Sequence, residues 1–403
     1  MMLTLELDCR QEFDPAREEE FFAALPSRAG VFLLAPSTPG AQPYLARTAD
    51  LRRAAERLLR TPEGLSKRLN LRAVARGIRY RVTGSKFEQL LTMYQHARRI
   101  FPRRYRDFLR LRPPAVLKVN LRNEYPRCYV TRRIVADGGS YFGPFASRRG
   151  AEAFAEEFLD LFKIRRCQIK IRRDPNFPGC IYSEMKMCLA PCFAGCTKQE
   201  YDGEVVRVLE TLTTSGEALE NSLEREREAA SEALDFERAA AVHKKIEKVA
   251  GILRGLPEMA RRVDQLDAVI LQRAVEENSV AVFIVRAGLI TARLLLRFGE
   301  LSSEPRSVEA IVRGQLEPSA AAGDASAAPT PDNAAALPGI ASRDARSMDA
   351  LPDARPELSE HLALIARWYY SKPRDGEILF RDADWPYRRI IRACSRVLAS
   401  AGS

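Results

Sequence analysis

The chain has 403 residues, of which 46% are hydrophobic, and a net charge of +11. This length allows about two to four domains, and this composition excludes wholesale disorder. No apolar run reaches the roughly 18 residues of a membrane span, and the N-terminus lacks the features of a signal peptide, so we expect a cytoplasmic protein. The three histidines lie far apart in the sequence, which argues against histidine-rich metal sites and most Ser-His-Asp hydrolases.

Most of the positive charge lies in one block of the chain. Residues 51–150 hold 25 Lys and Arg against 6 Asp and Glu, a local net charge of +19. A field of this sign and density attracts a polyanion, most simply nucleic acid. The alternative is an arginine-rich surface that contacts only solvent.

The first hundred residues predict a small α+β unit. Apolar runs at 28–34 and 43–46 predict two strands joined by a turn, and a helical stripe over 51–59 follows. Alternation at 78–82 predicts a third strand, and apolar spacing from residue 87 to 99 predicts a second helix. The expected order is therefore ββαβα.

Beyond this unit the pattern again mixes strands with helices. The later elements that we expect are strands within 115–145, a helix at 150–162, a loop-rich segment at 167–196, charged helices over 201–253, three strands within 266–298, a helix at 358–370, a strand at 377–380 and a helix at 386–399. Residues 317–356 are biased toward Ala, Pro, Asp and Ser, which predicts a disordered linker. The sequence thus predicts an α+β multidomain protein.

Five of the eight cysteines cluster in the loop-rich segment. Cys167, Cys180, Cys188 and Cys192 follow the spacing C-x12-C-x7-C-x3-C, and Cys196 comes three residues further on. Clustered thiolates in a reducing compartment suit zinc or an iron–sulfur cluster, and the spacing alone does not choose between them. We expect the surrounding basic residues to lower the pKa of these thiols. The alternative is a set of ordinary packed cysteines.

Several motifs occur in the order seen in one family. The runs YFGPF at 141–145, CLAPC at 188–192 and LDFERAA at 234–240 resemble the UvrC excinuclease family. That family makes the incisions of bacterial nucleotide excision repair, and its N-terminal nuclease has a GIY-YIG fold. GVF at 30–32 and YLAR at 44–47 lie where that fold has its two motifs.

The resemblance also implies where catalytic residues would lie. Tyr44 matches the tyrosine of the second motif, whereas Phe32 replaces the tyrosine of the first, and Arg47 stands in place of the usual lysine. Ala54 occupies the position of the catalytic arginine, and Met93 that of the metal-binding glutamate. A thioether is a poor ligand for Mg²⁺. We therefore expect a vestigial, nuclease-deficient site, with Mg²⁺ bound only if activity remains.

The family's second nuclease is an RNase H-like domain followed by helix-hairpin-helix motifs. Residues 356–403 resemble only the approach to that domain, and we expect the chain to lack it. The family's cysteine pattern implies an iron–sulfur cluster, expected as 4Fe–4S, held by Cys167, Cys180, Cys188 and Cys192, with zinc as the runner-up. Cys196 is then either a spare thiol or a ligand in place of one of the other four.

Residues 217–253 predict two antiparallel helices joined at 234–237, with small residues that allow close approach. This hairpin resembles the UVR motif, which implies docking to a UvrB-like partner. The alternative is a hairpin that packs only within the chain. The residues expected to contact the partner are Leu234, Phe236, Ala239, Ala240 and Ile246.

DNA is the second expected partner, through the basic block. The arginines expected to contact duplex DNA are Arg52, Arg53, Arg57, Arg98, Arg99, Arg103 and Arg104. The domains that we expect are a degenerate GIY-YIG-like unit at 1–110, a YFGPF and cysteine-cluster unit at 111–200, the UVR hairpin at 201–255 and an α+β region at 256–403.

Three functions remain open from the sequence. The first is a nuclease-deficient UvrC-like DNA-binding protein of nucleotide excision repair. The second is an active excinuclease with a single site that incises damaged DNA. The third is a metal-containing UVR adaptor that binds proteins and not DNA.

Overall fold

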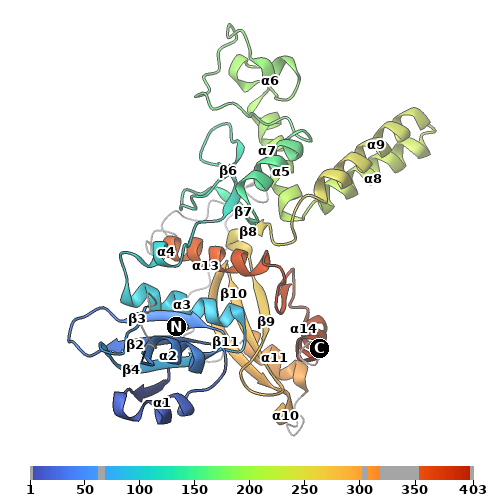
Figure 1. Ribbon diagram of the computed structural model, residues 1–403. Helices are drawn as coiled ribbons and strands as arrows, with labels where there is room; N and C mark the ends of the chain where they lie inside the picture. Colours follow the sequence, from blue (N-terminus) through green and yellow to red (C-terminus); the bar gives the residue numbers. More distant parts are fainter. Residues whose placement is uncertain (1–2, 62–68, 302–306, 318–353, 400–403) are drawn as a thin grey trace, which may run out of the picture.

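The computed structural model describes residues 3–61, 69–301, 307–317 and 354–399. Three four-stranded antiparallel sheets, each covered by helices, form the fold, which confirms the predicted α+β class (Figure 1). Most of the predicted linker at 317–356 lies outside the described residues, but Ala354 already begins a helix. Within the described ranges, no helix is both long and apolar enough to cross a membrane.

The first sheet belongs to the N-terminal unit and has the strand order β1-β4-β2-β3. Its elements are β1 (Cys9–Glu12), α1 (Glu18–Ala24), β2 (Gly30–Pro36), β3 (Tyr44–Thr48), α2 (Leu51–Leu59), β4 (Ala75–Val82) and α3 (Lys86–Ile100). The predicted ββαβα order is confirmed, with β1 and α1 preceding it. Asp50 caps α2 by accepting a hydrogen bond from the Arg53 amide at 2.9 Å, as its position before the helical stripe predicts.

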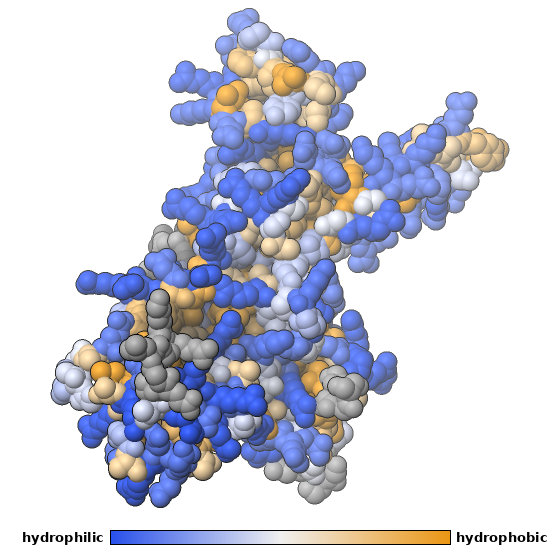
Figure 2. All heavy atoms as spheres, in the orientation of Figure 1, coloured by the Kyte–Doolittle hydropathy of each residue, from blue (hydrophilic) through white to orange (hydrophobic). Residues whose placement is uncertain are grey.

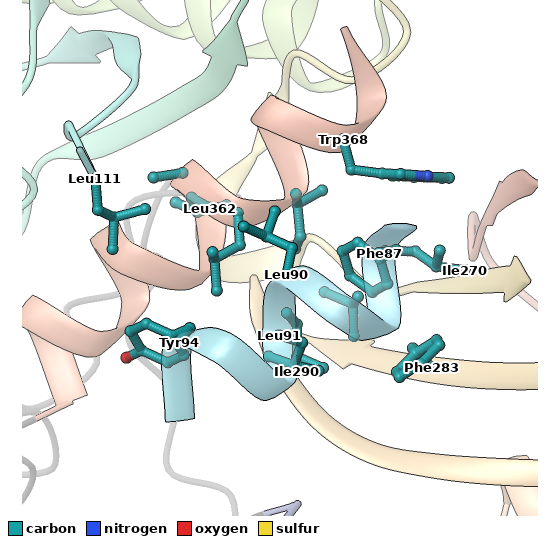
Figure 3. Close-up of a cluster of buried hydrophobic side chains, with 14 of the residues drawn as sticks. Phe87, Leu90, Leu91, Tyr94, Leu111, Ile270, Phe283, Ile290, Leu362 and Trp368 are labelled. Carbon is teal, nitrogen blue, oxygen red and sulfur yellow. The ribbon is translucent and has the colours of Figure 1, made fainter. Parts of the chain in front are cut away.

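Helix α3 is buried on two sides. It begins after Ser85, whose hydroxyl accepts a hydrogen bond from the Glu88 amide at 3.1 Å. Phe87 makes edge-to-face contact with Phe283 of the third sheet, with ring centroids 5.0 Å apart, and lies 5.3 Å from the ring of Trp368. Figure 3 shows α3 between the third sheet and a later helix, with side chains from all three meeting in one core.

The second sheet has the order β6-β5-β7-β8. Its strands and associated helices are α4 (Tyr105–Phe108), β5 (Ala115–Val119), β6 (Cys128–Thr131), β7 (Ser140–Phe145), α5 (Arg148–Leu159), α6 (Ile181–Glu184), α7 (Lys198–Thr213) and β8 (Arg261–Arg262). Phe154, Phe158 and Phe162 form a row of rings with centroids 5.4 and 5.0 Å apart. This row packs with α7 and β5 in a second core.

The predicted helical hairpin is present as α8 (Glu217–Glu232) and α9 (Phe236–Leu253). Leu234 adopts a left-handed backbone conformation, with φ of 56°, in the turn between them. The hairpin extends away from the rest of the molecule (Figure 1). Its base joins the second core through Leu219, Val249 and Ile252.

The third sheet has the order β11-β10-β9-β12, with helices on both faces. Its elements are β9 (Ala268–Arg273), β10 (Ser279–Arg286), β11 (Leu289–Arg297), α10 (Phe298–Leu301), α11 (Val308–Leu316), α13 (Ala354–Tyr369), β12 (Glu377–Phe380) and α14 (Tyr387–Ala399). Alternate residues of β9 and β10 enter different cores: Ile270 and Phe283 face α3 and α13, whereas Leu271 and Val282 face α11 and α14. The sheet therefore holds the N-terminal unit against the C-terminal helices.

Candidate functional site

The residues at the vestigial nuclease positions are divided between two cores. Phe32 and Ala54 are buried with α1 and α2, and the half-buried Tyr44 lies 6.1 Å from Phe32 between ring centroids. Arg47 is exposed on β3. Met93 belongs instead to the core that α3 shares with the third sheet and α13. The structure therefore does not bring Met93 together with Phe32, Tyr44 and Ala54 in one cluster.

The surroundings of Met93 show whether a metal-binding side chain could function at this position. Its exposed fraction is 7%, and the surrounding core contains Val31, Leu45 and Phe283. A carboxylate at this point would be buried among apolar side chains, which is costly without a charged partner. The position where the resemblance implies a metal-binding glutamate is thus a packing position in this chain.

A carboxylate does lie one turn earlier on α3, but it is already bound. Glu88 is fully buried and accepts hydrogen bonds from the Gly84 amide at 3.0 Å and from Arg81 at 3.4 Å. Arg293 on β11 forms an ion pair with it at 3.2 Å. Glu88 therefore ties the first sheet to the third, a role that sequence reasoning missed, although the motif Ser85-x-x-Glu88 signals a helix start.

The predicted DNA-binding arginines fall into two groups. Arg52 donates to the carbonyls of Leu25 and Ala23, while Arg98 and Arg99 form ion pairs with Glu357 at 2.8 Å and Glu6 at 3.0 Å. The remaining four are exposed, and they are Arg53, Arg57, Arg103 and Arg104.

The exposed group is the better candidate for binding a ligand. Arg53 has only a loose pairing with Asp50 at 3.7 Å. For Arg57, Arg103 and Arg104, the described residues supply no ion pair. Their guanidinium groups are thus available to contact phosphates, whereas Arg52, Arg98 and Arg99 already have partners within the chain.

The four predicted metal ligands lie in or beside the loop-rich segment around α6. Burial first, and then the charges of Cys167, Cys192 and Cys180, raise the pKa of the Cys188 thiol to about 11. Burial also raises the pKa of Cys192, so the expected lowering by basic neighbours is wrong for both thiols. Burial first, and then the charge of Glu200, raise the pKa of Cys196, and among the other cysteines only Cys192 acts on it.

Hydrogen bonds and one left-handed residue shape the backbone beside Cys167 and Cys188. The Ala190 amide donates a hydrogen bond to Cys188 Sγ at 3.3 Å, and Ala190 takes a left-handed conformation with φ of 55°. Buried Arg165 donates to the carbonyls of Tyr125 and Ile169 at 2.7 and 2.9 Å, which fixes the chain beside Cys167. The described residues hold no preformed group of three or more His, Cys, Asp or Glu at metal-binding geometry. A set of four thiols nevertheless fits a soft metal or a cluster, so the metal site stays a prediction.

The predicted partner-binding residues lie along the hairpin. Leu234 is 73% exposed and Phe236 is 66% exposed, and Figure 2 shows hydrophobic side chains at the free end of α8 and α9. Ala240 is exposed, whereas Ala239 and Ile246 are half-buried. The exposed apolar tip is the part of the hairpin that a partner can reach.

We expect this chain not to nick lesion-bearing duplex DNA with Mg²⁺ or Mn²⁺, because Ala54 and Met93 supply neither a cationic donor nor a metal ligand. A plasmid-relaxation gel measures this. Met93→Glu is not expected to restore nicking, since the new carboxylate would be buried in the core. Nicking by the wild-type protein that disappears in Tyr44→Phe would contradict the expectation.

Cys192→Ser should lose bound metal and weaken the order of the cysteine segment, because a hydroxyl is a poor replacement for a thiolate ligand. Iron, sulfide and zinc contents per chain after anaerobic purification measure the effect. Cys9→Ser, at an exposed cysteine on β1, is the matched control and should keep the metal. A colourless wild-type protein with one zinc per chain would show that the site holds zinc and not an iron–sulfur cluster. Equal metal content in the two variants would exclude Cys192 as a ligand.

Comparison with known protein families supports the resemblance. Residues 115–211 match the model of the UvrC/Cho excinuclease middle domain. UvrABC system protein C of Dehalococcoides mccartyi (strain CBDB1) is 28% identical over 275 residues, covering 67% of this chain and 44% of the relative. The same-named protein of Carboxydothermus hydrogenoformans is 28% identical over 282 residues, covering 69% and 46%.

A shorter match has higher identity. UvrABC system protein C of Ruminiclostridium cellulolyticum is 30% identical over 178 residues, covering 44% of this chain and 29% of the relative. No solved structure matches the chain. The chain spans less than half the length of the curated relatives that it matches. Together with the YFGPF strand, the cysteine segment and the helical hairpin, these matches show that the chain is similar to UvrC proteins over about two thirds of its length.

Proposed function

We propose that the protein binds DNA in nucleotide excision repair, that its N-terminal nuclease-like unit is inactive, and that its hairpin docks a UvrB-like partner. The observation that carries the proposal is that Met93 and Ala54 are buried in apolar cores, while arginines of the same basic block are exposed. Catalytic groups act as a unit, so loss of the metal ligand or of the cationic donor alone already removes most of the catalysis. Binding of the phosphate backbone requires neither group.

The charge of the exposed surface supports the DNA-binding part of the proposal. Arg103 and Arg104 lie exposed between α3 and α4, and Arg57 lies exposed on α2. Arginine contacts with phosphates give affinity without sequence preference, since they do not read base edges. An adaptor that binds only proteins does not need this block of positive charge.

The exposed tip of the hairpin supports the partner-binding part of the proposal. Leu234 and Phe236 expose large apolar surface at a free end that no other described segment covers. Exposed apolar clusters rimmed by charge are typical of protein interaction sites. Because the chain is similar to UvrC proteins, a UvrB-like protein is the partner that we propose.

The cysteine segment supports a structural cofactor. We propose that Cys167, Cys180, Cys188 and Cys192 hold a 4Fe–4S cluster, with zinc as the runner-up. The segment has few buried apolar side chains, and it exposes Ile181 (63%) and Met185 (62%). When bound, such a group supplies cross-links that replace a hydrophobic core.

Replacing Arg57, Arg103 and Arg104 together by Gln should weaken duplex DNA binding. If each of them contacts one phosphate, the slope of log K against log salt should fall in magnitude by about 2.7, because each phosphate contact contributes about 0.9. Fluorescence anisotropy at several salt concentrations measures both quantities.

A control variant removes the same charge elsewhere. Arg388, Arg389 and Arg392 are exposed on α14, and their joint replacement by Gln should leave the salt slope unchanged. Equal losses in both variants would mean that DNA responds only to net charge. Absence of DNA binding by the wild-type protein would contradict the proposed function itself and favour the protein-binding adaptor.

Leu234→Asp combined with Phe236→Ser should weaken binding of a purified UvrB-like protein at least tenfold, because apolar anchors at an interface commonly contribute about 2 kcal/mol or more each. Isothermal titration calorimetry measures the affinity. Both side chains are exposed, so the fold should not change.

Phe108→Ser is the matched control, since Phe108 is also exposed (46%) but lies near α4, away from the hairpin. It should bind the partner like the wild type. Unchanged affinity in the hairpin variant would show that the tip packs only within the chain or with a second copy, which light scattering would reveal.

A further inference from the structure

A cavity of about 550 Å³ opens where α4, α13 and the loop after β6 meet. Three arginines, Arg106, Arg132 and Arg133, line it together with the carboxylate of Glu360. These residues are far apart in the sequence, and none of the motifs described above includes them. The cavity lies outside the vestigial nuclease positions and outside the cysteine segment.

The base of the cavity is held rigidly by Glu360, whose side chain is 6% exposed. Its Oε1 accepts hydrogen bonds from Tyr105 at 2.6 Å and from Arg106 Nε at 2.7 Å, and its Oε2 accepts one from Tyr94 at 2.7 Å. Burial, followed by these hydrogen bonds, raises the pKa of both tyrosines, so both hydroxyls stay protonated donors. The carboxylate is thereby satisfied, and it fixes the guanidinium of Arg106 at the cavity.

The other two arginines have no such partner. Arg132 and Arg133 are exposed, and no carboxylate among the described residues pairs with either side chain. The nearest acid along this loop, Asp137, is bound by Lys118 and by the hydroxyl of Tyr141. With Glu360 satisfied, the cavity carries an excess of positive charge that no described group neutralises.

Apolar side chains form the remaining wall. Leu111, Ile134 and Val135 line the same cavity as the arginines. A phosphate alone would use the cations but not this wall, whereas a nucleoside phosphate presents an anion beside an apolar sugar and base face. The volume lies within the range of about 300–1,000 Å³ that is typical of small-molecule sites.

We propose that this cavity binds one nucleotide unit of single-stranded DNA, with the phosphate at Arg106, Arg132 and Arg133 and the sugar and base against Ile134 and Val135. The proposal rests on the proposed function of DNA binding. A single strand is required because a base within a duplex is stacked and cannot reach an apolar wall. The cavity then distinguishes an unpaired region from intact duplex, which the exposed arginines near α2 and α4 do not.

Arg132→Ala combined with Arg133→Ala tests the proposal on the full chain. The variant should bind a short labelled oligothymidine about tenfold more weakly at 0.1 M salt, and the salt slope should fall by about 1.4, because a single strand contributes about 0.7 per phosphate contact. Duplex binding should change less than twofold. Photocrosslinking of an iodouracil-substituted strand should label the peptide that contains Ile134 and Val135.

Arg122→Ala is the matched control, since Arg122 is exposed after β5 and does not line the cavity. An equal loss in this control, or an equal loss on duplex, would overturn the cavity site while leaving general DNA binding in place. Inorganic phosphate that competes as well as thymidine monophosphate would overturn the role of the apolar wall. If a free mononucleotide competes as well as the single strand does, the cavity binds free nucleotides, and the proposal that it binds a unit of single-stranded DNA is wrong.

Discussion

The burial of α3 on two sides is the constraint on which the rest of the structure depends. Phe87, Leu91 and Tyr94 of this helix pack into a core with Phe283 of β10 and the helix α13 (Figure 3). Truncating one such aromatic side chain commonly costs about 3–5 kcal/mol. A hydrated metal ion could not lie in this core, so the same packing that joins the sheets closes the position where a metal-binding nuclease residue is expected.

Two buried carboxylates stabilise this arrangement. Glu88 joins α3 to Arg81 and Arg293, and Glu360 joins α13 to α3 and α4. Removing one partner of a buried ion pair commonly costs about 3–5 kcal/mol, because the other charge is left without compensation. These pairs connect segments that are up to 266 residues apart. The Arg106 side of the cavity is consequently held in place by the fold itself.

The sequence predicted the regular elements well because their periodicity is local. The strands within 266–298 and the hairpin at 217–253 have strong apolar patterns, and the structure confirms them. Strand β1 was missed because Cys9–Glu12 is a short, largely exposed edge strand without alternation. Glu360 and the arginine cavity could not be predicted, because their partners come together only through tertiary packing.

The tip of the hairpin, unlike the core around α3, exposes its large apolar side chains. Leu219, Val249 and Ile252 are buried at its base and Ala230 and Val242 farther along, while the turn itself has the Asp235 cap and the exposed pair of Arg238 with Glu226 at 3.2 Å. Exposed ion pairs contribute at most about 1 kcal/mol, so these contacts add little stability to the turn. Leu234 and Phe236, at 73% and 66% exposed, have little apolar contact within the chain. Under the proposed docking, the apolar contact that these two side chains lack would come from the partner and not from the fold of their own chain.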